Sequence, residues 1–434
     1  MSLRRTLSGL LLLAPALSAA AQDPPLPGRL IERDAVAGDS TQHVAAYVPS
    51  GYASAHPAPV LFVLDPRGRA PLALRLFAGG AERHGWIVVS SYNSASDTQT
   101  DPNVDAMNAM LDWVQTHARI DTTRMYLAGF SGTARVGWTL AAELRGKVAG
   151  MFGTGGGVSF SARGPEMTFG GDSTFAFFGS AGSTDFNHAE MRGLAARLRT
   201  SRIPSRFEWF QGGHSWPPRW LCEQAIDWLE LRAMLGGRRP IDTAYVARQL
   251  ALDLRHADSL ERAGQWDGAE LRYREIALDV PGRPEGRLAL ARADEIGKRD
   301  ALLTLREHIR LSAETDLSDA TREFSALQAA RTSPSALAPE TLLERIGVES
   351  LRRRAASPDS TQRDAALRRL SNIAAWVSFY EPRSFLAAGE PARAAASLRA
   401  AAMLGPLRGE SCDLVRRTAE QLPREDAQRL PPCS

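Results

Sequence analysis

The first half of the chain alternates short apolar runs, rich in β-branched and aromatic residues, with segments whose apolar residues recur every three or four positions. Residues 104–117 show this helical spacing, and a further helix is expected over 70–84. The expected strands are 44–49, 60–64, 86–92, 125–128, 148–152, 174–178 and 207–210. Strands that alternate with helices predict an α/β fold with a doubly wound, mostly parallel sheet that is covered on both faces.

The pattern changes after residues 236–240, which read Gly-Gly-Arg-Arg-Pro. Beyond this stretch the β-prone runs disappear and Ala, Leu, Arg and Glu dominate, which predicts an all-α region. The length of the chain favours two or three domains on a prior of about 150 residues for each. We therefore expect an α/β domain over 22–237 and an all-α domain over 238–434.

Two segments of the helical region repeat each other at a spacing similar to that of tetratricopeptide repeats. Each has an alanine, a large residue and a proline 5, 9 and 17 positions after a glycine: Gly264, Ala269, Tyr273 and Pro281, and Gly389, Ala394, Leu398 and Pro406. Glycine permits the tight turn between paired helices, and proline ends the second helix. A stacked array would offer a concave surface to a protein or peptide partner, or pack on the α/β domain and shape its entrance. An ordinary helical bundle is the alternative.

The first 21 residues have the order of a secretory signal peptide. Arg4 and Arg5 precede an apolar run over 7–17, which is followed by three alanines that end at Ala21. This run is shorter than the roughly 20 residues that a membrane-spanning helix needs. No later stretch is long and apolar enough, so no membrane span is expected. The mature chain should begin at Gln22 and be exported to a bacterial periplasm or beyond.

Composition excludes several other classes of site. The net charge is only +3, and no basic cluster typical of a nucleic-acid surface is present, so no nucleic-acid partner is expected. Three cysteines in an oxidising compartment permit one disulfide. Cys412 and Cys433 could join near the end of the chain, which would leave Cys222 unpaired. Without a Cys-x-x-Cys or His-x-x-x-His spacing, a structural zinc site has no support.

The stretch 124–146 carries the strongest chemical signal. An apolar strand leads into Gly129-Phe130-Ser131-Gly132-Thr133, and a helix rich in Ala and Leu follows over 134–144. Strand, sharp turn with a serine at its tip, and helix form the context of a nucleophile elbow. The amide of Gly132 would be free to donate to a developing oxyanion. A plain helix N-cap is the alternative for Ser131.

Two partners for this serine lie after later strands, where the functional groups of a parallel sheet collect. Asp185 follows the strand 174–178 and His214 follows the strand 207–210. The order Ser, acid, His is that of the α/β-hydrolase triad. His214 would take the proton of Ser131, and Asp185 would orient the imidazole. A helix cap for Asp185 and an unremarkable loop position for His214 are the alternatives, and His188 is a weaker rival base.

The second oxyanion donor should come from the loop after the strand 60–64. Pro66 has no amide hydrogen, so Arg67 is the first choice and Gly68 the second. The side chain of Arg67 is also a candidate for binding an anionic part of the substrate, with simple solvation as the alternative.

Four motifs together resemble the α/β-hydrolase branch of polyhydroxybutyrate-depolymerase-like, feruloyl-esterase-like and dienelactone-hydrolase-like enzymes. They are Leu-Asp-Pro-Arg-Gly at 64–68, Gly-Phe-Ser-Gly at 129–132, Asp-Phe-Asn at 185–187 and Gly-Gly-His-Ser-Trp-Pro at 212–217. The resemblance covers about the first half of the mature chain. It implies hydrolysis of a small-molecule or polymeric ester through an acyl-enzyme, with no metal or cofactor.

The sequence departs from this branch in two places. Asp65 and Pro66 replace the His-Gly often found after the third strand, and Thr133 replaces the last glycine of the elbow. The segment between the strand 148–152 and Thr174 is short, so no large lid is expected and an open site would suit bulky esters. The rival hypotheses are a serine peptidase with the same triad, and a non-catalytic binding protein in which the helical region does the work.

Overall fold

The structure is a computed structural model that describes residues 27–98, 100–144, 146–158, 175–201, 203–333 and 335–433. These residues form two compact units. The first holds the described parts of Met1–Phe152, Thr174–Ala176 and Pro218–Ala233, and the second those of Gly153–Ser173, Phe177–Pro217 and Met234–Ser434. The expected signal peptide over 1–21 lies outside the described residues, as does most of the segment 153–174 in which no large lid is expected. The expected boundary between residues 237 and 238 stays a prediction.

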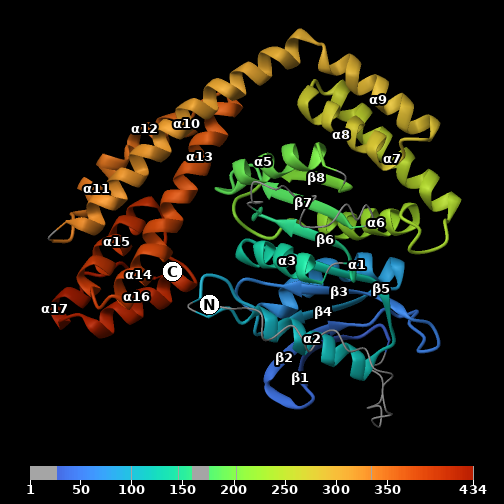
Figure 1. Cartoon of the computed structure of the whole chain (residues 1–434). Coiled ribbons are helices and arrows are strands. Elements are labelled where there is room, and N and C mark those ends of the chain that lie inside the picture. The colour runs from blue at the N-terminus through green and yellow to red at the C-terminus, as the bar shows by residue number, and fades with distance from the viewer. Residues whose placement is uncertain are drawn as a thin grey trace. The chain divides into compact units, whose positions relative to one another are not determined.

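The α/β part contains one sheet of eight strands. They are β1 (Leu30–Val36), β2 (Asp39–Tyr47), β3 (Ala58–Leu64), β4 (Ile87–Ser91), β5 (Ile120–Phe130), β6 (Val148–Thr154), β7 (Ala176–Gly182) and β8 (Ser205–Phe210). Their order is β1-β2-β4-β3-β5-β6-β7-β8 (Figure 1). β2 is antiparallel to β1 and β4, whereas β3 is parallel to β4 and β5, and β7 is parallel to β8. The expected mostly parallel α/β sheet is confirmed.

The central strands follow from their continuous apolar runs. Every residue of β3, β4, β6 and β7 is buried, as expected for strands covered on both faces. β1 was not expected from the sequence. Its residues Leu-Ile-Glu-Arg-Asp-Ala-Val carry charges in the middle, and most of them are exposed or half-buried at the edge of the sheet. Pairing with β2, rather than an apolar pattern of its own, makes this segment a strand.

In the part of the chain that the structure describes, five helices accompany the strands: α1 (Ala70–His84), α2 (Asn103–His117), α3 (Gly132–Glu143), α5 (His188–Arg199) and α6 (Arg219–Leu235). The expected helices over 70–84 and 104–117 are confirmed, whereas α6 was not expected. α1 ends at Gly85, whose φ of 70° is left-handed. α1 packs closely on α6, because an added Cβ at Gly80 would lie 3.1 Å from Ile226. Arg83 of α1 also pairs with Glu223 and Asp227 of α6.

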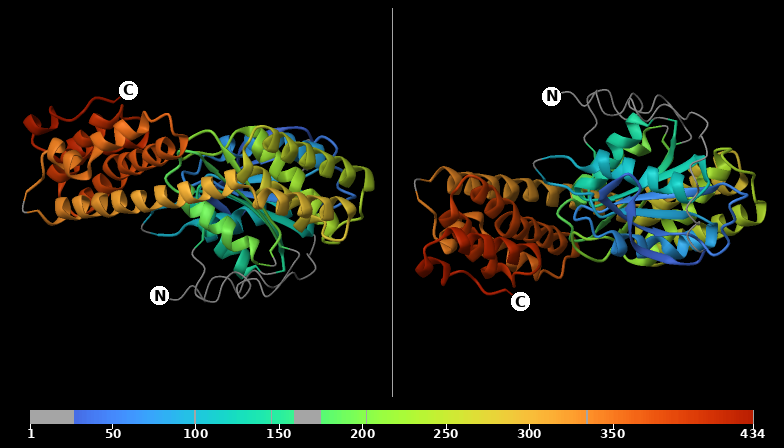
Figure 2. Two further views of the ribbon diagram at one scale, coloured as in Figure 1. Left: turned by 90° about the horizontal axis from the view of Figure 1, so that it is seen from above. Right: turned by 90° about the horizontal axis from the view of Figure 1, so that it is seen from below.

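The remainder of the chain is helical, as the sequence predicts (Figure 2). Its elements are α7 (Thr243–Arg262), α8 (Trp266–Asp279), α9 (Pro284–Gly297), α10 (Asp300–Thr332), α11 (Pro339–Ile346), α12 (Val348–Ala355), α13 (Ser360–Ala375), the π-helix Trp376–Tyr380, α14 (Glu381–Ala387), α15 (Pro391–Leu404), α16 (Glu410–Gln421) and α17 (Arg424–Ala427). The C-terminal part of α10 shares one apolar core with the helices that follow it, including Leu327, Ile346, Ile373 and Leu398. Within the described ranges, no helix has the length and apolar character that crossing a membrane requires.

The two repeated segments adopt the same local arrangement. Gly264 lies between α7 and α8 with φ of 70°, and Gly389 lies between α14 and α15 with φ of 73°. Ala269 and Ala394, five residues later in each segment, are fully buried. Glycine therefore makes the turn and alanine permits close packing in both segments, as their spacing predicts. Assignment of the region to tetratricopeptide repeats stays a prediction.

The cysteines pair as the sequence permits. Cys412 and Cys433 form a disulfide with Cα atoms 5.6 Å apart, and Leu407 forms a β-bridge with Cys433. The bond therefore ties the end of the described chain to α16. Cys222 is buried and forms no disulfide, and burial raises the pKa of its thiol.

Helices α7 and α8 cover the edge strand β8 through buried charges. Arg206 of β8 donates to Asp253 of α7 and to Asp279 at the end of α8, at 2.7 Å in each case. The amide of Phe207, which the edge would otherwise leave open, donates to Oε1 of Glu275 at 2.9 Å. An edge strand with satisfied backbone groups is protected from pairing with other chains. The helical region and β8 thus belong to one compact unit.

This cluster predicts a pH-dependent stability. Burial raises the pKa of Glu275 to about 7, against the opposing effect of Arg272 and Arg206. The folded state holds a proton that the unfolded chain releases above a pKa of 4.5, so the stability that Glu275 contributes is lost as pH rises through about 7. Glu275→Gln keeps the acceptor for Phe207 and removes the titration. We expect its melting temperature to fall less between pH 5 and 8 than that of the wild type.

The negative charge of Glu208 also raises the pKa of Glu275, while Asp253 and Asp279 pair with Arg206 in the same cluster. The exposed Glu349→Gln is the control, and its melting curve should follow the wild type at each pH. Parallel pH profiles of the wild type and Glu275→Gln would contradict the assignment.

Candidate active site

Ser131 is the turn residue between β5 and α3. Its φ of 55° and ψ of −126° place a non-glycine residue in a conformation that costs energy. Among the described residues only Asp97 shares a positive φ without being glycine. The side chain is nearly buried, with 8% of the residue exposed. This is the backbone geometry of a nucleophile elbow, because the sharp turn projects the serine away from both strand and helix.

The glycines beside Ser131 are required by close contacts. An added Cβ at Gly129 would lie 2.6 Å from the carbonyl oxygen of Thr133, and one at Gly132 would lie 2.3 Å from Cβ of Ser96. Gly132 begins α3, and the amide at the first position of a helix has no acceptor within the helix. Ser96 was missed by the sequence analysis, because it lies in a polar loop with no motif. Its hydroxyl donates to Asp97 at 2.9 Å.

Thr133 takes over a structural role at the position usually held by the last glycine of the elbow. Its side chain is fully buried. The hydroxyl lies 2.6 Å from the carbonyl oxygen of Leu64 and 2.8 Å from that of Phe130, and it accepts a hydrogen bond from the Phe130 amide at 3.2 Å. The departure from the usual elbow pattern therefore links the turn at Ser131 to the end of β3.

The second unit brings Asp185 and His214 together. Nδ1 of His214 lies 2.9 Å from Oδ1 of Asp185, whose side chain is fully buried. An ionised carboxylate only accepts hydrogen bonds, so Nδ1 carries the proton and Nε2 is the acceptor nitrogen of the ring. Oδ1 also accepts from the amide of Asn187, the residue before α5, at 2.8 Å. Asp185 thus accepts a hydrogen bond at the start of α5 and another from His214. The helix-cap role and the contact with the histidine, which the sequence offered as alternatives, are both present.

The loops that carry these two residues are joined by backbone hydrogen bonds. The amide of Ser183 donates to the carbonyl of Phe210 at 2.8 Å, and that of Thr184 donates to Gly212 at 2.9 Å. The ring of Phe186 packs on His214 with centroids 4.1 Å apart. These hydrogen bonds and this ring contact therefore fix the positions of both loops that carry the Asp185–His214 pair.

His188, the rival base, faces a different set of groups. Its Nδ1 lies 2.9 Å from the carbonyl oxygen of Gly182, and its ring packs against Trp209. Burial lowers the pKa of His188 to about 4, and the positive charges of Arg368 and Arg192 contribute. A neutral ring whose Nδ1 donates to the backbone is better explained as a structural residue than as the general base.

The loop after β3 is organised by Asp65. Its fully buried carboxylate accepts from the amide of Arg67 at 2.8 Å, from the amide of Arg69 at 3.1 Å and from the Arg69 guanidinium. The amide of Gly68 donates to the Asp65 carbonyl at 3.1 Å. Both candidate oxyanion donors on this loop are thus engaged within it. Either would have to share or exchange its hydrogen bond to contact a substrate.

The predicted site residues fall in both compact units. Ser131, Gly132 and Arg67 belong to the first, and Asp185 and His214 belong to the second. The structure joins Asp185 to His214 and sets Ser131 and Gly132 at one turn.

No protein-family model matches the sequence, and no curated protein matches it. Solved structures of serine hydrolases and esterases are similar to it. FphF, a fluorophosphonate-binding serine hydrolase of Staphylococcus aureus, is 14% identical with a TM-score of 0.38, over 47% of this chain and 98% of that one. A ferulic acid esterase is 13% identical with a TM-score of 0.40, over the same shares. The feruloyl esterase module from Clostridium thermocellum complexed with sinapinate is 14% identical, with a TM-score of 0.35, over 50% of this chain and 92% of that one. Similarity at this level carries neither a reaction nor a substrate over to this chain.

The close approach of Gly132 to Ser96 predicts that a larger residue at position 132 displaces Ser131. Gly132→Ala would place its Cβ 2.3 Å from Ser96 and displace the elbow. We expect reaction of Ser131 with a fluorophosphonate probe to slow at least about tenfold, because small displacements of a reacting group are costly. Gly132→Ala combined with Ser96→Gly, which removes the clashing atoms, should recover part of the rate. Equal labelling of the wild type and Gly132→Ala would contradict this geometry.

The hydroxyl of Thr133 predicts a loss of stability. Thr133→Val keeps the shape of the side chain and removes the hydrogen bonds with Leu64 and Phe130. We expect the free energy of unfolding to fall by about 1–3 kcal/mol, because buried backbone groups lose their partner. Denaturant unfolding measures the change, with the exposed Thr139→Val on α3 as control. A Thr133→Val variant as stable as this control would show that the link is not stabilising.

Proposed function

We propose that the protein is an exported serine hydrolase that cleaves carboxylic esters through an acyl-enzyme at Ser131. The observation that carries the proposal is the combination of a serine at a strained strand-to-helix turn with a hydrogen-bonded Asp185–His214 pair. Their chain order, Ser, Asp, His, supports an α/β-hydrolase triad. The relay from Ser131 to His214 is part of the proposal.

In the first half of the reaction, Oγ of Ser131 attacks the ester carbonyl carbon and Nε2 of His214 takes the hydroxyl proton. The imidazolium that forms is stabilised by the carboxylate of Asp185, which accepts the hydrogen bond from the Nδ1–H group. The tetrahedral intermediate then collapses, and the alcohol leaves with the proton from His214. The acyl group remains as an ester on Ser131.

In the second half, a water molecule attacks the acyl group, and His214 accepts a proton from it. Collapse of the second intermediate releases the carboxylic acid and returns the proton to Ser131. In both halves the amide of Gly132 at the start of α3 donates to the oxyanion, aided by the positive end of the helix dipole. The second donor is the amide of Arg67 or Gly68, once it is released from Asp65.

Export to a bacterial periplasm or beyond belongs to the same proposal. It rests on the predicted signal peptide over 1–21, and the bond between Cys412 and Cys433 supports it, since disulfides persist in oxidising compartments. The substrate is a small-molecule or polymeric ester, and a protein or peptide partner on the helical region remains a further proposal. The reaction as written requires no metal or cofactor.

A serine-directed fluorophosphonate probe tests the proposed nucleophile. We expect the full-length wild type to be labelled, with the adduct on Ser131, and Ser131→Ala to lose both labelling and at least about a thousandfold of its hydrolysis of a chromogenic ester. Ser180→Ala is the control, because Ser180 is a buried serine whose hydroxyl bonds to Thr154. Its labelling should equal that of the wild type.

An unlabelled wild type would overturn the proposal and favour the non-catalytic binding protein. Faster cleavage of aminoacyl amides than of esters across a panel of chromogenic substrates would replace the esterase with a peptidase.

A further inference from the structure

The peptide group between Ser183 and Thr184 is held at both ends. Its N–H, from Thr184, donates to the carbonyl of Gly212 at 2.9 Å. Its C=O, from Ser183, accepts from Nη1 of Arg368 at 3.0 Å. Gly212 lies two residues before His214, and Thr184 directly precedes Asp185. One peptide plane therefore connects the two loops of the acid–base pair to an arginine of the helical region.

Arg368 lies on α13, 185 residues away along the chain from Ser183. It is half-buried, and burial lowers the pKa of its guanidinium, as do the nearby charges of Arg369 and Arg192. Asp316 and Asp364 act in the opposite direction. A charged donor in such surroundings makes a stronger hydrogen bond than a neutral one.

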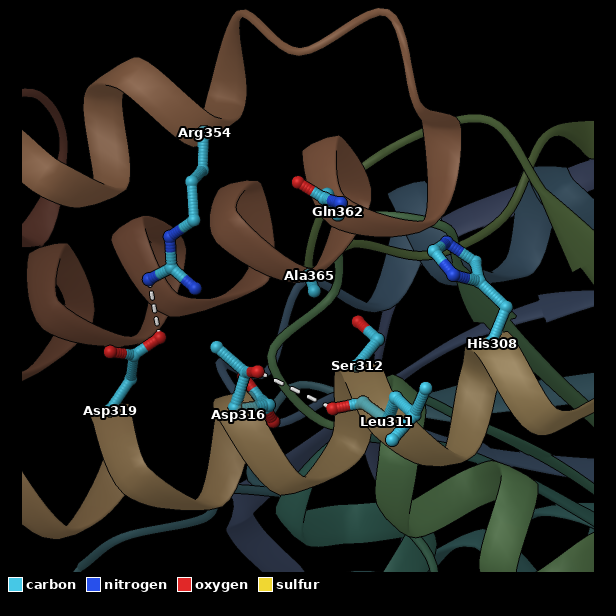
Figure 3. Close-up of a pocket in the computed structure, with 9 residues that line it drawn as sticks. His308, Leu311, Ser312, Asp316, Asp319, Arg354, Gln362 and Ala365 are labelled. Atoms are coloured by element: carbon cyan, nitrogen blue, oxygen red, sulfur yellow. Dashed lines mark hydrogen bonds and ion pairs between the residues drawn. The ribbon is translucent and has the colours of Figure 1, made fainter.

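The neighbouring Arg369 anchors this part of α13 on α10. Its guanidinium donates to both carboxylate oxygens of Asp316, at 2.7 and 3.0 Å, and lies 3.4 Å from Glu323. Asp316 also lines a pocket of about 340 Å³ between α10, α12 and α13, together with Asp319 and Arg354 (Figure 3). Beside this pocket α10 and α13 are joined by the Arg369–Asp316 ion pair, and they share the apolar core that includes Ile373.

We propose that Arg368 is a positioning residue for the acid–base pair, and that the helical region holds the Asp185 loop in its working geometry through it. The inference rests on the proposed function of Asp185 and His214. Without Arg368, the Ser183 carbonyl loses its charged donor, and the peptide plane before Asp185 is fixed at one end only. Asp185 then aligns the imidazole of His214 less well, which lowers the rate of proton transfer without removing substrate contacts.

Three full-length variants on α13 test this role. Arg368→Met keeps the length of the side chain and removes the donor, Arg368→Lys retains a charged donor, and Arg363→Met is the matched control. We expect Arg368→Met to lower kcat for a chromogenic ester about tenfold with KM within about twofold, since misplaced groups cost rate more than binding. Arg368→Lys should recover most of this loss, and Arg363→Met should match the wild type.

A readout independent of turnover separates this inference from the proposed function. The Nδ1 proton of His214 should give a downfield NMR resonance in the wild type, in Arg368→Lys and in Arg363→Met, which is shifted or lost in Arg368→Met. A wild type that gives this resonance without hydrolysing esters would overturn the esterase proposal alone. An unchanged resonance and an unchanged kcat in Arg368→Met would overturn the positioning role, as would equal losses in Arg368→Met and Arg363→Met.

Discussion

The hydrogen bond between Nδ1 of His214 and Oδ1 of Asp185 requires that the two loops that carry these residues keep a fixed relative position. Its two partners lie on loops that follow neighbouring parallel strands, β7 and β8. Loops are the most mobile parts of a fold, so a bond between two of them lasts only where their backbones are fixed. Here the amides of Ser183 and Thr184 donate to the carbonyls of Phe210 and Gly212, and the amide of Asn187 donates to the same Asp185 oxygen.

The helical region contributes to this arrangement through two sets of contacts. Buried carboxyl groups of α7 and α8 accept hydrogen bonds from Arg206 and from the open amide of Phe207 on the edge strand β8. In addition, Arg368 of α13 bonds to Ser183 in the loop of Asp185. Charged groups removed from water need partners of good geometry, which makes such contacts selective for one arrangement. The helices are therefore built into the unit that carries the acid–base pair.

Sequence reasoning succeeded where a few adjacent residues dictate the structure. The glycines around Ser131 indicated a sharp turn, and the turn is present with a positive φ at the serine. Sequence reasoning failed where a long-range contact, rather than a motif of adjacent residues, determines the structure. Thr133 departs from the elbow pattern, yet its hydroxyl bonds to Leu64, 69 residues earlier in the chain. The charged β1 gave no signal, because its pairing with β2, rather than its own pattern, decides its structure, and the helix α6 was not expected.

By itself the sequence determined the succession of strands and helices apart from β1 and α6, the turn at Ser131 and the change to an all-helical region. Hydrophobic period and glycine placement act over a few residues, so a linear pattern records them. Only the tertiary structure decided that Asp185 meets His214, that Asp65 engages the amide of Arg67, and that Arg368 reaches Ser183. These contacts depend on side-chain direction and on the packing of distant segments, and neither can be deduced from a periodic pattern in the sequence.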